Sequence, residues 1–194
     1  MGIFQSLIEQ SKLPNGRLGR MMLRIMNHAH NGLTLWGLSK LKPCQVVLDV
    51  SCGGGNAIHL MTEMNHFSHI FGIDFSPDAV SLTTDKNRKD IENGIVTVLQ
   101  ASVLELPFES NFFDAVTTFQ SHYHWSDILA SMQEIYRVLK PGGQFVLVAE
   151  VYKIKYHMKE YNSIEQTITL FEDSKFKDIN LVSNIKYICV TGNK

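Results

Sequence analysis

The chain has 194 residues, 44% of them hydrophobic and 19% charged, which is enough for one well-buried domain and too short for two. Its formal net charge of −1 argues against a protein that wraps nucleic acid, and no apolar run is long enough for a membrane-spanning helix. The three cysteines form no CxxC pair, so neither a disulfide framework nor a zinc site is indicated, and a reducing, cytoplasmic compartment fits best.

The N-terminal segment, residues 1–41, has apolar positions at helical spacing, and Asn31-Gly32 divides it into two predicted helices. Residues 1–45 contain six basic residues and one acid, a local charge of +5. We expect a helical lid here that covers a ligand site and attracts an anionic small molecule, because residues 151–162 leave little room for another cover. The alternative is an ordinary solvated helix face formed by Arg17, Arg20 and Arg24.

The remaining core, residues 42–194, alternates between strand and helix patterns. Short apolar runs predict strands at residues 46–50, 70–73, 95–99, 115–119, 145–151, 180–182 and 187–190. Helices are predicted at residues 56–65, from Ser76 with Pro77 in the first turn, at 126–139 before Pro141-Gly142-Gly143, and at 163–171. This alternation predicts an α/β fold with a doubly wound parallel sheet, covered by helices on both faces.

A glycine-rich turn follows the first predicted strand, in the run Asp49-Val50-Ser51-Cys52-Gly53-Gly54-Gly55. Glycines let a backbone approach a ligand closely, and the following helix presents free N–H groups there. A dinucleotide site would have GxGxxG spacing, whereas here the glycines are contiguous and residue 58 is Ile. The carboxylate of Asp49 suits a ligand with an ammonium group. The alternative is a tight turn that binds nothing.

Asp74 ends the second predicted strand, nineteen residues after Gly55. A carboxylate at this position can accept hydrogen bonds from both hydroxyls of a ribose, so a nucleoside ligand is indicated. Several kinds of nucleoside site share this acid, and it does not choose between them. The alternative is a solvated aspartate that precedes a helix.

Several blocks stand in the order and spacing of class I S-adenosylmethionine-dependent methyltransferases. They are residues 47–55, Gly72-Ile73-Asp74, Leu106-Pro107-Phe108, residues 111–116 and residues 134–143. Over residues 42–190 the chain resembles the ubiquinone/menaquinone-biosynthesis type, a broad group of small-molecule methyltransferases, and residues 14–38 are similar to uncharacterised bacterial members. The resemblance implies a Rossmann-like seven-stranded sheet of order 3-2-1-4-5-7-6, with the last strand antiparallel.

The resemblance also implies roles for individual residues. The methionine part of the cofactor would be held by Asp49, Ser51, Cys52, Gly53 and Gly55. The ribose and adenine would contact Asp74, Phe75, Ser102 and Val103, and the methyl-transfer site would be lined by Gln120 and Ser121. Two residues depart from the family pattern. Ser51 replaces a glycine and Ser102 replaces an acid, which puts cofactor affinity in doubt.

The run Gln120-Ser121-His122-Tyr123-His124-Trp125 follows the fourth predicted strand, at the edge where ligands bind in this fold. His122 or His124 has a suitable ordinary pKa for a general base, and Tyr123 could orient the acceptor. The alternative is that these histidines only pack in the loop. No third ligand accompanies them, so no metal is expected. Other candidates for facing the substrate are His28, His30 and Trp36, for which a purely structural role is the alternative.

The resemblance implies an enzyme that transfers a methyl group from S-adenosylmethionine to an O, N or C atom of a small-molecule acceptor, leaving S-adenosylhomocysteine. One rival is an NAD-dependent oxidoreductase, which the glycine spacing disfavours. Another is a cofactor-binding protein without catalysis, suggested by the two serine departures. A nucleic-acid methyltransferase lacks support because no Asn/Asp-Pro-Pro-Tyr motif follows the fourth strand. The expected partner is thus a small molecule and no nucleic acid, with the protein a monomer or homodimer.

Overall fold

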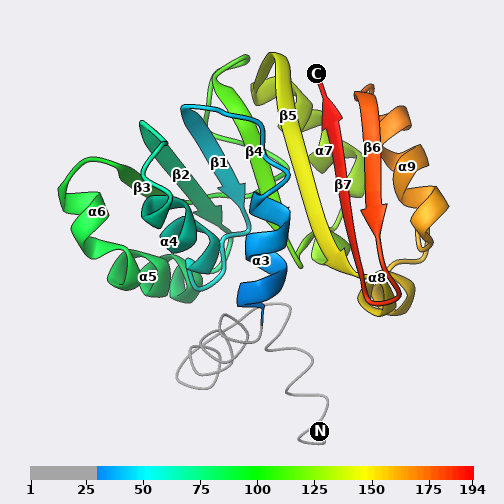
Figure 1. Ribbon diagram of the computed structural model, residues 1–194, viewed down its shortest axis with the longest axis horizontal. Coiled ribbons are helices and arrows are strands. Elements are labelled where there is room, and N and C mark those ends of the chain that lie inside the picture. The colour runs from blue at the N-terminus through cyan, green and yellow to red at the C-terminus, as the bar shows by residue number, and fades with distance from the viewer. Residues whose placement is uncertain (1–29) are drawn as a thin grey trace, which may run out of the picture.

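The computed structural model describes residues 30–194. Its centre is a seven-stranded sheet in the order β3-β2-β1-β4-β5-β7-β6, which confirms the expected topology (Figure 1). The first five strands pair in parallel, and β7 runs antiparallel to both β5 and β6. Most of the expected N-terminal lid, including His28, Arg17, Arg20 and Arg24, lies outside the described residues. Of the two helices expected there, the structure describes the second, α3.

The elements follow the predicted alternation closely. The strands are β1 (Val46–Val50), β2 (His69–Asp74), β3 (Val96–Gln100), β4 (Phe113–Phe119), β5 (Leu139–Glu150), β6 (Lys177–Ser183) and β7 (Tyr187–Asn193). The helices are α3 (Asn31–Leu38), α4 (Asn56–Glu63), α5 (Pro77–Lys86), α6 (Arg88–Glu92), α7 (Ile128–Val138), α8 (Val151–His157) and α9 (Ile164–Asp173), with a 3₁₀ turn η1 (His122–His124). Among the described helices, none is long and apolar enough to cross a bilayer.

Alternating residues along the central strands build two apolar layers. Val47 of β1 packs in a cluster with Ile58 of α4, while the next residue, Leu48, packs in another with Ile135 of α7. Successive side chains of a strand point to opposite faces of a sheet, so each layer receives every second residue. In Figure 1, α3 lies in front of the sheet and α7 behind it. The helices therefore cover both faces, as the sequence predicts.

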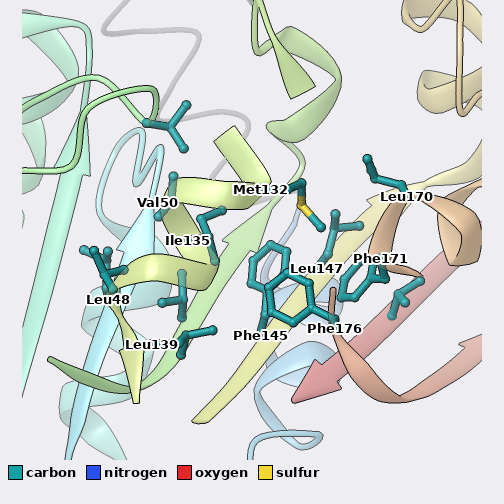
Figure 2. Packing of buried hydrophobic residues seen from close by; sticks show 14 of the residues in the cluster. Leu48, Val50, Met132, Ile135, Leu139, Phe145, Leu147, Leu170, Phe171 and Phe176 are labelled. Atoms are coloured by element: carbon teal, nitrogen blue, oxygen red, sulfur yellow. The ribbon is translucent and has the colours of Figure 1, made fainter. Parts of the chain in front are cut away.

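The larger core cluster lies between the sheet and the helices α7 and α9. Figure 2 shows Phe145 of β5 beside Phe176, with Phe171 of α9 close by and Met132 of α7 above them. The rings of Phe145 and Phe171 stack with centroids 5.3 Å apart. This packing fixes the position of β5, whose carboxyl end contributes to the site described below.

Two local features differ from the sequence prediction. The structure ends α7 at Val138 and places Pro141-Gly142-Gly143 inside the long strand β5, because Leu139 already pairs with Phe113 of β4. The region after β5 also forms a helix, α8, where the sequence predicted no element. The predicted start of α5 is confirmed, since the Ser76 hydroxyl accepts from the Ala79 N–H and Pro77 opens the helix.

Candidate active site

A cavity of about 410 Å³ opens at the carboxyl edge of the parallel strands. Its walls come from the segments that follow β1, β2, β3 and β4 and from the start of α3. It brings together most of the residues expected at the site, namely Asp49, Ser51, Cys52, Gly53, Asp74, Phe75, Ser102, Val103, Gln120, Ser121 and His124. The cavity is large enough for a drug-sized ligand such as a nucleoside conjugate.

The turn after β1 has an unusual backbone. Ser51, Gly53 and Gly55 all have positive φ, at 58°, 57° and 73°. This region is easy for glycine and strained for serine. Gly55 does not line the cavity, and a Cβ there would lie 2.9 Å from the Cα of Thr83 in α5. Within the described structure, Gly55 therefore serves the close packing of this turn on α5.

Asp49 sits at the carboxyl end of β1 and is almost fully buried. The Thr117 hydroxyl donates a hydrogen bond of 2.8 Å to its Oδ1. Burial raises the pKa of Asp49 to about 7; the Thr117 hydrogen bond opposes this rise, and the nearby Asp74 adds to it. A buried carboxylate in a cavity wall is stabilised most strongly by a cation bound beside it.

Asp74 closes the neighbouring strand and holds the glycine turn. Its Oδ2 accepts from the Gly53 N–H at 2.9 Å, and its Oδ1 accepts from the Ser76 N–H at 2.9 Å. Burial raises the pKa of Asp74, although these backbone donors act in the opposite direction. Each carboxylate oxygen can accept more than one hydrogen bond, so Asp74 retains capacity for ligand hydroxyls.

Cys52 and Ser102 line the cavity with limited chemistry. Burial raises the pKa of the Cys52 thiol well above its usual range, so it is a neutral packing group there. The Ser102 hydroxyl oxygen accepts from the Leu104 N–H at 3.2 Å. One lone pair of that oxygen is therefore used by the turn itself, and one remains for a ligand. Val103, a neighbour in the same turn, adds apolar wall.

The residues that follow β4 do not all face the cavity. His124 and Gln120 line the cavity, whereas His122 and Tyr123 do not. His122 is 1% exposed, neither of its ring nitrogens has a hydrogen-bond partner among the described residues, and burial lowers its pKa to about 3. Tyr123 donates its hydroxyl to the Oε1 of Gln120 at 3.1 Å. The geometry thus separates His122 and Tyr123 from direct contact with a cavity ligand.

Gln120 is held in a strained conformation, with φ of 57°. Its Oε1 also accepts from the backbone N–H of Glu150 at 3.1 Å. Its buried Nε2 has no hydrogen-bond partner within residues 30–194. An unpartnered buried donor in a cavity wall is costly unless a ligand or water accepts from it, so this amide is a candidate ligand contact.

Sequence reasoning assigned no role to several lining residues. Trp125 donates its indole N–H to the Ser51 Oγ at 3.1 Å, which joins the turns after β1 and β4. His30, expected only as one of several substrate-facing candidates, lines the cavity with its Nε2 3.8 Å from the Glu150 Oε2. Trp36 does not line the cavity and packs against the sheet. Other lining residues not anticipated are Thr34, Asn56, Phe119 and Ser126.

Comparison with known proteins extends these observations. Residues 48–147 match the family model described as a methyltransferase domain. A 2-phytyl-1,4-naphtoquinone methyltransferase of Nostoc punctiforme is 32% identical over 111 residues, which cover 57% of this chain and 48% of that protein. The chain thus spans about half the length of the curated relatives it matches.

Two solved structures share the fold. Phosphoethanolamine N-methyltransferase 2 of Haemonchus contortus, in complex with S-adenosyl-L-methionine, aligns with a TM-score of 0.70 and 18% identity over 86% of this chain and 52% of that one. The [4+2]-cyclase SpnF aligns with a TM-score of 0.72 and 22% identity over 86% and 81% of the two chains. With its sheet order and its matched residues together, the chain belongs to the methyltransferase domain family and has the fold of class I S-adenosylmethionine-dependent methyltransferases.

Proposed function

We propose that this protein binds S-adenosylmethionine in the cavity and transfers its methyl group to a small aromatic acceptor related to quinones. The observation that carries the proposal is the placement of two carboxylates, the buried Asp49 and the partly buried Asp74, on either side of the glycine turn in one cavity. Membership of the methyltransferase family supports the reaction, and the name of the Nostoc relative supports the acceptor class.

The cavity residues fit the two ends of this cofactor. Asp49 would pair with the ammonium group of the methionine part, beside the backbone of Gly53. Asp74 would accept from the ribose hydroxyls, and Phe75, Ser102 and Val103 would contact the adenine. When bound, S-adenosylmethionine would supply a methyl carbon that an acceptor atom can attack in line, with S-adenosylhomocysteine as the leaving group.

The same arrangement disfavours NAD. A pyrophosphate at the start of α4 would lie beside the glycine turn, close to the carboxyl group of Asp49 in β1. Two negative charges that lie close together in a poorly solvated site repel each other strongly. A cationic ligand gains from the carboxylate of Asp49, so this residue favours the sulfonium cofactor over a dinucleotide.

The other part of the cavity suits an aromatic acceptor. Phe119 and Trp125 offer apolar surfaces, and His30 and His124 offer titratable groups in the same cavity. Burial lowers the pKa of His30, and the charge of Lys153 lowers it further, so the imidazole is neutral and can accept a proton at pH 7. Most of the rate can come from holding the acceptor close to the methyl group and away from water. A base is needed where the acceptor atom must lose a proton, as a hydroxyl or a ring carbon must.

The alternative is cofactor binding without methyl transfer. Ser51 and Ser102 depart from the family pattern, and the likeness to SpnF shows that this fold also occurs in a cyclase. Binding and turnover must therefore be measured separately.

Calorimetry tests the binding. S-adenosylmethionine and S-adenosylhomocysteine are expected to bind and NAD is not. Loss of hydrogen bonds to a charged group costs about 1.5–3 kcal/mol, so Asp74→Ala is expected to weaken binding by roughly 10- to 150-fold. The control is Asp85→Ala, which removes an exposed acid of α5 that pairs with Arg88 of α6, and it is expected to leave the affinity unchanged. No binding, or equal affinity in both variants, would overturn the proposal.

Turnover is tested with radiolabelled cofactor and a panel of naphthohydroquinones and simple phenols. Methyl transfer to a naphthohydroquinone supports the acceptor class. Binding without transfer to any panel member favours the non-catalytic alternative, and transfer to phenols alone removes the quinone assignment while leaving the enzyme class.

A further inference from the structure

The most exposed large apolar side chains gather at one edge of the molecule. Among residues 30–194, those exposed by more than 60% are Ile185 at 99%, Tyr156 at 70%, Phe75 at 65% and Tyr152 at 63%. Phe75 follows β2, the two tyrosines lie on α8 directly after β5, and Ile185 lies in the turn between β6 and β7. The segments that carry these residues all lie at the carboxyl edge of the parallel strands, and loops at this edge line the cavity. Figure 1 shows α8 beside the turn that joins β6 and β7.

Helix α8 and the β6–β7 turn form one continuous surface beside the cavity. The Val151 N–H donates to the Lys186 carbonyl at 2.9 Å, which fixes the start of α8 to the turn. At the other end of α8, the ring centroids of His157 and of His124, a cavity residue, are 4.9 Å apart. The exposed surface and the cavity wall are thus parts of the same unit.

This surface is basic as well as apolar. Residues 150–160 and 184–186 contain four lysines and two acids, Glu150 and Glu160, which leaves a local charge of +2. Lys153 is paired with Glu150 at 2.7 Å, whereas Lys155, Lys159 and Lys186 are exposed. Tyrosine and lysine together are typical of membrane interfaces, because each has an apolar stem and a polar tip. Exposed lysines beside protruding apolar side chains are attracted to anionic headgroups.

We propose that this docking face, formed by Tyr152, Lys155, Tyr156, Ile185 and Lys186, seats the protein on an anionic phospholipid bilayer. A protein partner fits less well, because charged residues are depleted at the centre of protein interfaces and here lysines separate the apolar side chains. Docking in this orientation turns the cavity towards the headgroups. On the proposed function, an acceptor ring can then enter the cavity while its hydrocarbon tail stays in the bilayer.

Vesicle sedimentation with the full chain tests the docking, with no cofactor present. Phosphatidylcholine vesicles containing phosphatidylglycerol are expected to bind the protein, pure phosphatidylcholine vesicles much less, and added salt is expected to release it. Each lysine near an anionic surface contributes about fivefold in affinity, so the pair Lys155→Glu and Lys186→Glu is expected to weaken binding by at least about 25-fold. Ile185→Ser is expected to weaken it by about tenfold.

The matched control, Lys175→Glu with Lys177→Glu, reverses the charge of two exposed lysines at the start of β6, at the opposite edge of the sheet. This pair makes the same change in net charge and is expected to leave vesicle binding within about twofold of the wild type. Absence of vesicle binding, equal binding to neutral vesicles, or equal losses in the two pairs would overturn the proposal. So would concentration-dependent dimerisation that Ile185→Ser abolishes without any vesicle binding.

Calorimetry with S-adenosylmethionine separates this inference from the proposed function. The variant pair at Lys155 and Lys186 is expected to bind the cofactor as the wild type does, because neither residue lines the cavity. Vesicle binding without cofactor binding would leave the docking face in place and remove the enzyme assignment. Cofactor binding without vesicle binding would keep the proposed function and remove the docking face.

Discussion

The indole N–H of Trp125 donates to the Oγ of Ser51 at 3.1 Å, across the cavity edge between the loops that follow β4 and β1. Ser51 has a φ of 58°, which costs a non-glycine residue about 1 kcal/mol or more. The serine that replaces the expected glycine thus carries backbone strain and gains a hydrogen bond. Since both loops line the cavity, this bond links the glycine turn after β1 to the cavity wall formed after β4.

Substitutions at Ser51 separate these two effects. Ser51→Ala keeps the strain and removes the acceptor, so we expect a loss of about 1 kcal/mol in the free energy of unfolding. Ser51→Gly removes both the strain and the acceptor, so the two changes offset and stability stays within about 1 kcal/mol of the wild type. Urea denaturation measures both variants. Equal destabilisation by alanine and glycine would show that the backbone strain is negligible.

Trp125→Phe completes a double-mutant cycle with Ser51→Ala. Because the hydrogen bond joins these two side chains, we expect a coupling energy of about 0.5–1.5 kcal/mol between the two substitutions. Purely additive effects would mean that the contact does not contribute to stability.

The raised pKa of Asp49 predicts a pH-dependent affinity for S-adenosylmethionine. With a pKa of about 7, Asp49 is half ionised at pH 7 and nearly neutral at pH 5, and only the carboxylate attracts a cation. The α-amino group of the ligand remains protonated throughout this range. We therefore expect affinity to fall by about 50-fold from pH 7 to pH 5 on account of Asp49 alone, measured by calorimetry.

Two variants check this assignment. Asp49→Asn is expected to bind S-adenosylmethionine more weakly at pH 7. Its affinity is expected to depend less steeply on pH, because the titration of Asp49 is gone and only a contribution from Asp74 can remain. Thr117→Val removes the hydrogen bond that favours the ionised form, so the midpoint of the pH dependence is expected to move upward. An unchanged slope in Asp49→Asn would assign the titration to another group.

Sequence patterns located the glycine turn and both acids because each is tied to the end of a strand. Asp49 is the penultimate residue of β1 and Asp74 is the last residue of β2, and parallel neighbouring strands place their carboxyl ends together. The same logic grouped residues 120–125 at this edge, but a loop has no fixed periodicity to tell which side chains face inward. The 3₁₀ turn η1 buries His122 and directs His124 to the cavity, and the sequence holds no signal for that division.

Helix α8 shows a second limit of sequence reasoning. Its run Val-Tyr-Lys-Ile-Lys-Tyr-His follows a buried strand and alternates apolar with polar residues, which fits an extended segment as well as a short helix. Within it, only Ile154 is fully buried. The helix is therefore held by its junctions with η1 and the β6–β7 turn, contacts between distant parts of the chain that periodicity does not report.

Gly37 of α3 is expected to tolerate no side chain. A Cβ at this position would lie 2.5 Å from the Cγ2 of Val148 and 2.7 Å from the Cε1 of Phe119. Alanine normally favours a helix over glycine, but overpacking here is expected to cost about 1–3 kcal/mol in the free energy of unfolding. Phe119 also lines the cavity, so Gly37→Ala is expected to weaken ligand binding as well.

The control for this substitution is on the same helix. A Cβ at Gly32 would meet no atom within 4 Å, so Gly32→Ala is expected to stabilise the protein by about 0.5–1 kcal/mol. Thermal denaturation of both variants measures the difference. If both alanines stabilise, α3 does not pack on β5 as closely as the structure shows.

His122 predicts an acid sensitivity of the fold. Burial lowers its pKa to about 3, against about 6.5 in the unfolded chain, so the unfolded state binds one more proton between these values. The stability due to neutral His122 is fully present above pH 6.5 and is lost as the pH falls. From pH 7 to pH 5 this loss amounts to about 2 kcal/mol. Asp49 has the opposite sign, because its folded pKa is raised and lower pH favours its folded neutral form.

The contribution of His122 must therefore be measured as a difference between proteins. His122→Leu keeps a similar volume and removes two buried ring nitrogens that lack partners among the described residues. We expect the variant to equal or exceed the wild type in stability at pH 7, and its advantage to grow by about 2 kcal/mol at pH 5. His66→Leu makes the same chemical change at an exposed position and serves as the control. Urea denaturation at both pH values gives the two differences, and an advantage that does not change with pH would mean that His122 does not titrate as its burial requires.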